Sequence, residues 1–177
     1  MARDWLLECD TCTGPVLTMD VRDSLFQLDP FGKGSPTVKG LQVYQEHPSQ
    51  TTQHWLTKWP IGTCKGIEFD EPMLCSGTTT GTRAAILAYL GIMYEEMKVW
   101  ISDTTNCHFD INGDDQSIHN YLYYSGQLPF ATSIRNRAGG IVNTVGVEGA
   151  RVFKAHKQNV IVKGIPESQG KQGGSFK

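Results

Sequence analysis

Three charged residues directly follow an apolar stretch near the start of the chain. Residues 16–19 are mostly apolar, and Asp20, Arg22 and Asp23 come immediately after them. Open α/β sheets bind ligands at the carboxyl ends of their strands, and carboxylate oxygens there suit Mg²⁺ or Mn²⁺. Two interpretations follow: Asp20 and Asp23 hold a divalent cation beside a substrate phosphate, or Asp23 caps a helical turn and pairs with Arg22.

A second candidate is the small-residue segment 76–82, "SGTTTGT". Read as a loop, it allows backbone N–H groups to approach a ligand closely at Gly77 and Gly81, with a helix N-terminus behind them. It lacks the lysine of a phosphate-binding G-x-x-x-x-G-K loop. The alternative interpretation is a glycine-punctuated connection between a strand and a helix.

Asp115 and Gln116 form the third candidate, at the expected start of a helix. The segment that begins at residue 110 opens like a calcium-binding loop, but Asp115 stands where glycine is required and Tyr121 where glutamate is required. It is therefore a poor match to a calcium site. An acid–base or sugar-binding pair in a cleft is the functional interpretation, and two helix-capping aspartates are the alternative.

Several other polar and aromatic side chains are interpreted as structural. His119 lies four residues after Asp115 on the same helical face, where a lone histidine is more often structural than a ligand. The aromatic residues are expected in the core or at its rim, with a sugar-stacking platform as the alternative. They are Trp55, Trp59, Tyr121, Tyr123 and Tyr124.

Length and composition predict a single α/β domain over residues 1–156 and a polar, disordered tail over 157–177. The net charge of −2 argues against nonspecific nucleic-acid binding. No apolar stretch reaches the ~20 residues of a membrane helix, and the N-terminus does not resemble a signal peptide. The five cysteines leave one unpaired if the rest form disulfides, and the Cys9/Cys12 pair lacks the further ligands of a zinc site.

Periodicity and turn signals place the elements that must position these candidates. The expected strands are 15–19, 41–44, 73–75 and one or two within 134–149. The expected helices are 3–8, 83–100 and one that begins at 114 or 115 and ends before Gly126. The helix over 83–100 carries the clearest apolar stripe, with Thr82 as its N-cap. This order of elements predicts an α/β fold.

Three segments in sequence order resemble a known family. They are "VLTMDVRDSLFQLDPF", "PMLCSGTTTGTRAAILAYLGIMYEEM" and "GDDQSIHNYLYYSGQL". Together they resemble eukaryotic GT-A-type glycosyltransferases, the nucleotide-diphospho-sugar transferases. The resemblance implies a GT-A-like, Rossmann-like mixed sheet flanked by helices, with the first nucleotide-binding βαβ portion missing. It also implies transfer of a sugar from a nucleotide-diphosphate donor to a hydroxyl of a glycan or glycoprotein acceptor.

The resemblance further implies roles for single residues. Asp20 and Asp23 fall on the motif that holds Mn²⁺ or Mg²⁺, although Arg22 replaces the acid of a D-x-D pattern. Ser76 and Gly77 fall on the segment that lines the donor sugar; Asp20 and Arg22 would also contact the donor. The positions nearest the reacting centre would be taken by Asp115 and Gln116.

The same resemblance implies a place in the Golgi or secretory pathway, with membrane attachment only through an N-terminal anchor that this chain lacks. An alternative stays open: a non-catalytic relative or fragment that keeps the fold and binds carbohydrate or protein. Glycan binding without nucleotide or metal would distinguish that alternative from an enzyme.

Overall fold

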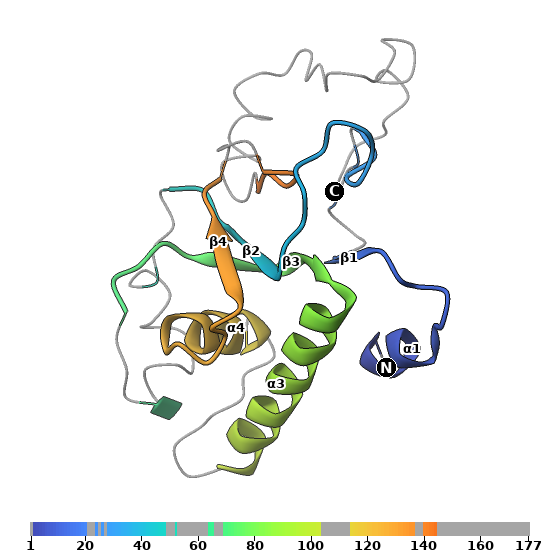
Figure 1. The fold of residues 1–177 in the computed structure, drawn as a ribbon. Coiled ribbons are helices and arrows are strands. Elements are labelled where there is room, and N and C mark those ends of the chain that lie inside the picture. The colour runs from blue at the N-terminus through green and yellow to red at the C-terminus, as the bar shows by residue number, and fades with distance from the viewer. Residues whose placement is uncertain are drawn as a thin grey trace, which may run out of the picture.

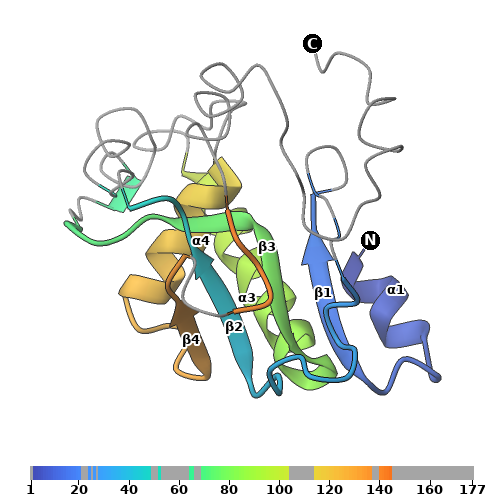
Figure 2. The same cartoon turned by 90° about the horizontal axis from the view of Figure 1, so that it is seen from above.

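The computed structural model describes residues 2–20, 24, 26, 28–48, 52, 64–65, 69–103, 114–136 and 140–144. Seven elements follow one another in this part of the chain. They are α1 (Ala2–Glu8), β1 (Pro15–Met19), β2 (Leu41–Gln45), β3 (Leu74–Thr82), α3 (Arg83–Ser102), α4 (Asp114–Tyr124) and β4 (Ala131–Ile134). The strands form one mixed sheet, and α3 and α4 cover the same face of it (Figures 1 and 2). The expectation of an α/β fold is confirmed.

The sheet has the strand order β1-β3-β2-β4. β3 runs antiparallel to both of its neighbours, and β2 runs parallel to β4. Because β1 and β2 both oppose β3, their carboxyl ends meet the beginning of β3 at one edge of the sheet. That edge is where Asp20 follows β1.

The prediction that residues 76–82 form a loop is wrong. They belong to the central strand β3, which pairs with β1 from Pro15↔Thr82 to Met19↔Thr78. Three consecutive threonines, residues 78–80, explain the difference, since β-branched side chains favour extended backbone and pack well on a pleated sheet. The small-residue composition that indicated a loop is needed here for close packing. A Cβ at Gly81, for example, would lie 2.9 Å from the Gly40 carbonyl oxygen.

β3 is nevertheless irregular where the loop was expected to begin. Val43 of β2 is opposite Thr79, but the next residue of β2, Tyr44, is opposite Cys75. The three residues of β3 between these two partners therefore have no register partner on β2. Such a bulge bends a strand and redirects its side chains, and bulges are frequent beside functional sites. The bulged segment is residues 76–78.

α3 forms as the sequence predicts. The Thr82 hydroxyl accepts a hydrogen bond from the Ala85 N–H at 3.3 Å, as an N-cap does. Ile86 and Trp100, at the two ends of the predicted stripe, are buried in the core. The intervening stripe residues pack against that core as partly buried side chains: Leu90, Met93 and Met97.

α4 also begins where predicted, at Asp114. It ends in a Schellman motif: the Gln127 N–H donates to the Leu122 carbonyl and the Gly126 N–H to that of Tyr123. Gly126 has a φ of +76°, a backbone conformation that favours glycine. Ile118 and Leu122 are fully buried, as their spacing predicts.

The core lies between the sheet and the two long helices. Its sheet side is formed by Leu41, Val43 and Leu74, and its helix side by buried residues of α3 and α4. α1 packs beside α3, where the Arg83 guanidinium donates to the Leu6 carbonyl at 2.8 Å and so satisfies a free carbonyl at the end of α1.

Two predictions for the C-terminal half have different outcomes. One or two strands are expected within 134–149, and β4 reaches this segment only at Ile134, where it pairs in parallel with β2. Residues 137–139 and 145–149 of the segment lie outside the described residues. Among the described residues after Arg135 there is no strand. The predicted tail over 157–177 lies outside the described residues, as does the tryptophan pair Trp55 and Trp59.

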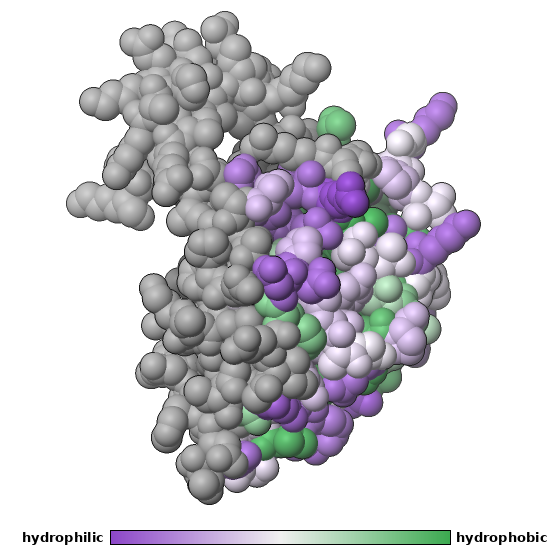
Figure 3. All heavy atoms as spheres, turned by 90° about the vertical axis from the view of Figure 1, so that its left-hand side faces the viewer, coloured by the Kyte–Doolittle hydropathy of each residue, from purple (hydrophilic) through white to green (hydrophobic). Residues whose placement is uncertain are grey.

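The surface and the cysteines complete the description. On the face drawn in Figure 3, hydrophilic and intermediate residues cover most of the described surface, and hydrophobic residues form small separate patches. No helix in the described ranges is both long and apolar enough to cross a membrane. Cys9 and Cys12 form a disulfide, so they offer no thiolates to zinc. Cys64 is also disulfide-bonded, and Cys75 is a free thiol.

Candidate functional site

Asp20 and Gly77 meet at the edge of the sheet where β1 ends. The Asp20 N–H donates to the Gly77 carbonyl at 2.8 Å, so the β1–β3 pairing continues one residue beyond the strand. The Asp20 carboxylate lies over Gly77: a Cβ added at position 77 would be 2.6 Å from Oδ2 of Asp20. Only glycine leaves room for the carboxylate here. The first and second candidate segments are thus in contact.

Ser76 and Asp115 join the third candidate segment to the other two. The Ser76 hydroxyl donates to Oδ2 of Asp115 at 3.2 Å, from the bulged segment of β3 to the first turn of α4. Asp115 is exposed, as Asp20 is, so both carboxylates are accessible to a ligand. A carboxylate in the first turn of a helix is stabilised by the helix dipole. Since Ser76 and Gly77 are adjacent, the two aspartates flank one short segment of backbone.

Gln116 is not directed to the same place as Asp115. Its side-chain amide donates to the Leu74 carbonyl at 2.9 Å. Asn120, one turn later, accepts from the Leu74 N–H at 2.8 Å and donates to the same Leu74 carbonyl at 3.0 Å. Side chains of α4 thus form hydrogen bonds with the backbone N–H and carbonyl of Leu74, just before the bulge, as the backbone of a neighbouring strand would. The structure therefore uses the Gln116 amide nitrogen to hold the strand.

Two residues that the sequence analysis did not select also lie at this edge. Cys75 is a free, half-buried thiol, and burial raises its pKa to about 12, with the charge of Glu46 as the next cause. Its sulfur would be 3.7 Å from a Cβ at Gly77, which the Asp20 carboxylate also approaches. Glu46 extends β2 by one residue, because its N–H donates to the Met73 carbonyl at 2.7 Å.

A signal for Glu46 was present in the sequence. It follows a strand with apolar residues, as Asp20 does, and both strands end at the same edge because both oppose β3. Cys75 had no comparable signal. Its thiol lies near Asp20 because the pairing of β1 with β3 continues to Asp20 and Gly77, two residues after Cys75 in β3.

A buried pair lies behind these residues, between α3 and α4. The Tyr89 hydroxyl and Nδ1 of His119 are 2.7 Å apart, and the two rings are nearly perpendicular. Burial lowers the pKa of His119 to about 4, so the imidazole is neutral near pH 7. Burial also raises the pKa of Tyr89, and the charge of Asp115 adds to that effect. The expectation that His119 is structural agrees with this complete burial.

A divalent cation is implied only by the family resemblance. Within the described ranges, no group of three or more His, Cys, Asp or Glu residues is arranged to hold a metal ion. Asp20 supplies an accessible carboxylate, and Arg22 and Asp23 lie outside the described residues. Mg²⁺ is often bound through one or two carboxylates together with substrate phosphates and water. Asp20 would supply one such carboxylate.

The structure thus brings together Asp20, Ser76, Gly77 and Asp115, which come from three separate parts of the sequence. Comparison of the chain with protein-family models, with curated proteins and with solved structures finds no match. The function must therefore be argued from this site and from the sequence motifs.

Proposed function

We propose that this protein is a metal-dependent glycosyltransferase of the GT-A type. It would move a sugar from a nucleotide-diphosphate donor to a hydroxyl group of a glycan or glycoprotein acceptor. The observation that carries the proposal is the contact of three motif segments at one sheet edge: Asp20 over Gly77, and Ser76 bonded to Asp115.

The geometry supports separate roles for the two aspartates. Asp20 ends β1 and is the accessible carboxylate that a cation would need, and Asp23, three residues later, would be its second ligand. A divalent cation at this position would supply positive charge for the diphosphate leaving group. The backbone of Ser76 and Gly77 would face the donor sugar, because their bulge leaves them without register partners on β2.

Asp115 would act on the reacting sugar or acceptor. Its carboxylate is accessible and is oriented by the Ser76 hydroxyl. It would accept the proton of the acceptor hydroxyl if the anomeric configuration is inverted, or stabilise an oxocarbenium-like centre if it is retained. Gln116 would support the reaction indirectly, by holding the strand that carries Cys75 and Ser76.

Calorimetric titration of the protein with Mn²⁺ and a panel of nucleotide sugars tests the proposal. We expect at least one nucleotide sugar to bind in the presence of Mn²⁺, and Asp20→Asn to weaken this binding at least tenfold. Asp10→Asn, which changes an exposed aspartate between Cys9 and Cys12, is the matched control and should bind as the wild type does. Asp115→Asn should lower the transfer rate by about 10²–10⁴, the usual contribution of a general base, while donor binding is retained.

Absence of any nucleotide-sugar binding, or an Asp20→Asn variant equal to the wild type, would contradict the proposal. Binding of a glycan that requires neither nucleotide nor metal would instead favour the non-catalytic alternative.

A glycine substitution tests the contact itself. Gly77→Ala places a methyl group where the Asp20 carboxylate lies, so Asp20 must move and Mn²⁺-dependent binding should fall about tenfold or more. Gly14→Ala is the control, because a Cβ at position 14 meets nothing within 4 Å. Equal binding by both variants would show that the placement of Asp20 does not matter for the ligand.

A further inference from the structure

A cavity of about 420 Å³ lies at the opposite end of β1 and β3 from the candidate site. Its floor includes Pro15 and Thr82, the first register pair of the two strands, whereas Asp20 and Gly77 lie beyond the last pair. Asp20 is five positions after Pro15 along the strand, which corresponds to roughly 17 Å. The cavity is therefore a separate place on the molecule, and neither the motifs nor the proposed reaction uses it.

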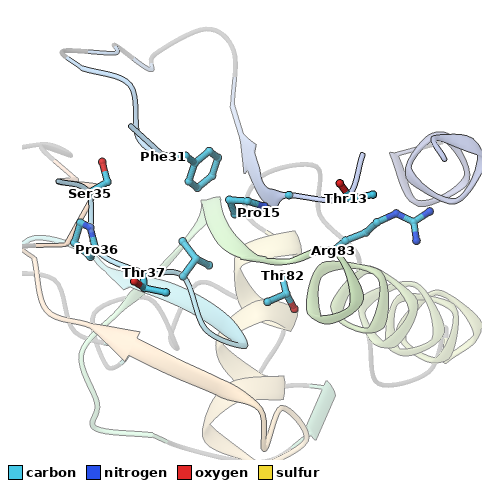
Figure 4. Close-up of a pocket in the computed structure, with 10 residues that line it drawn as sticks. Thr13, Pro15, Phe31, Ser35, Pro36, Thr37, Thr82 and Arg83 are labelled. Carbon is cyan, nitrogen blue, oxygen red and sulfur yellow. The ribbon is translucent and has the colours of Figure 1, made fainter. Parts of the chain in front are cut away.

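Apolar surfaces and hydroxyl groups line this cavity together. The ring of Phe31 lies above Pro15, with Pro36 and Thr37 on the adjoining wall (Figure 4). Further hydroxyl groups come from Thr13 and Ser35, beside Val38. An aromatic ring with a few polar groups around it is the usual composition of a small-ligand site, and 420 Å³ is within the usual range of volume.

The wall that carries Phe31 is held in place by its own hydrogen bonds. Oδ1 of Asp29 accepts from the Phe31 N–H at 2.9 Å, and the Gly32 N–H donates to the Asp29 carbonyl at 3.2 Å. The Ser35 N–H then donates to the Gly32 carbonyl at 3.0 Å. Pro36 adds a fixed φ immediately afterwards. The ring is thus positioned before any ligand binds, which lowers the entropy cost of binding.

The charges around the cavity favour an uncharged ligand. Among the described residues that line it, none is acidic and Arg83 is the one cation. In Figure 4 the Arg83 side chain points away from Phe31 towards α1, where Nη2 bonds the Leu6 and Leu7 carbonyls at 2.8 and 3.3 Å. Arg83 Nε is buried without a hydrogen-bond partner among the described residues. The guanidinium keeps its positive charge, but it is directed towards backbone carbonyls of α1 and not into the cavity.

We propose that this cavity binds one uncharged pyranose unit, as a saccharide site separate from the candidate catalytic site. The C–H face of the sugar would pack on Phe31 and the prolines, and its hydroxyls would bond the threonine and serine hydroxyls. An anion would find the Arg83 guanidinium turned away from it, and a purely apolar ligand would cover polar groups such as the Thr37 hydroxyl without offering them a hydrogen bond. The proposal goes beyond the proposed function and does not depend on it.

Saturation-transfer NMR with methyl pyranosides of glucose, galactose, mannose and N-acetylglucosamine tests the proposal. For a ligand of this size we expect a Kd on the order of 1 mM. Phe31→Ala should weaken binding of the preferred sugar at least tenfold, and Thr37→Val about threefold, because it removes one hydroxyl and keeps the shape. Phe26→Ala is the control, since Phe26 is an exposed phenylalanine that does not line the cavity.

Two further measurements make the result decisive. Asp20→Asn should bind the pyranoside as the wild type does, so a failure of the proposed transferase function would leave this result unaffected. A circular-dichroism melting curve of Phe31→Ala should match that of the wild type, and Thr37→Val provides the readout if it does not. The proposal is overturned if no pyranoside binds, if neither the Phe31 nor the Thr37 variant weakens binding, or if inorganic phosphate displaces the sugar.

Discussion

Helices α3 and α4 pack on the same face of the sheet but bury different chemistry. The buried residues of α3 are apolar or aromatic, among them Ile86 and Trp100. α4 buries Ile118 and Leu122, but beside them it also buries three polar side chains: Ser117, His119 and Asn120. A buried polar group is costly unless it is hydrogen-bonded. The contacts of these buried polar groups therefore indicate which neighbouring elements α4 positions.

Two of these three polar side chains are directed at the strand and at the helix that form the site, whereas the Ser117 hydroxyl has no hydrogen-bond partner among the described residues. Asn120 bonds both backbone groups of Leu74, and His119 bonds Tyr89 of α3. α4 is thereby fixed in register against β3, and this register places Asp115 beside Ser76. α3 supplies most of the apolar burial, and α4 supplies the position of the candidate site. The comparison can be tested by substitutions that affect one kind of contact at a time.

The largest expected effect is on the pH dependence of stability, through His119. Its pKa is about 4 in the folded protein and near 6.5 when unfolded. Below pH 6.5 the unfolded chain therefore binds a proton that the folded protein does not. His119 therefore does not lower the free energy of unfolding above pH 6.5. As the pH falls from 6.5 towards 4, the free energy of unfolding should decrease by about 3 kcal/mol. Urea unfolding, followed by tryptophan fluorescence from pH 7 to pH 4, measures it.

Two variants isolate the histidine. His119→Gln should remove this part of the pH dependence, whatever its effect on stability at pH 7. Tyr89→Phe removes the hydrogen-bond partner but keeps the burial that lowers the pKa, so its pH dependence should stay close to that of the wild type. A wild-type pH dependence equal to that of His119→Gln would show that His119 does not titrate as its burial requires.

The next largest effect is expected from Asn120. Asn120→Leu keeps the approximate volume but leaves the Leu74 N–H without an acceptor, and should cost about 2–3 kcal/mol in the free energy of unfolding. Gln116→Leu is the matched change, because the Leu74 carbonyl still accepts from Asn120. It should cost only about 1 kcal/mol. Equal losses in the free energy of unfolding for the two variants would mean that Asn120 does not replace a neighbouring strand as the hydrogen-bond partner of Leu74.

The sequence predicts both helices and the first strand. The stripe of α3, its N-cap and the position of α4 follow from local spacing and capping rules, and the structure agrees with them. The same rules apply to β1, whose predicted limits of 15–19 match the strand. These elements depend on neighbours within a few residues, and such neighbours are visible in a sequence.

Long-range pairing could not be predicted in the same way. The segment 76–82 was interpreted as a loop because its residues are small, but it is a central strand whose partners lie about 40 and 60 positions earlier in the chain. The role of the Gln116 amide depends on its hydrogen bond to Leu74. Glu46 lies at the same edge as Asp20 only because β1 and β2 both run antiparallel to β3. The candidate residues could be selected by motif resemblance, whereas their contacts required the register of the sheet.

The smallest effect tests α3 at the end where it joins β3. Thr82→Ala removes the hydroxyl that accepts from the Ala85 N–H, and the loss of an N-cap costs about 1 kcal/mol. Because Thr82 lies at the far end of β3 from Asp20, this cost should appear in the urea midpoint and leave Mn²⁺-dependent binding unchanged. Thr82→Ser keeps the hydroxyl and is the control. If Thr82→Ala instead impaired ligand binding as strongly as Gly77→Ala, the two ends of β3 would be coupled, and the division between a stabilising helix and a site-positioning helix would fail.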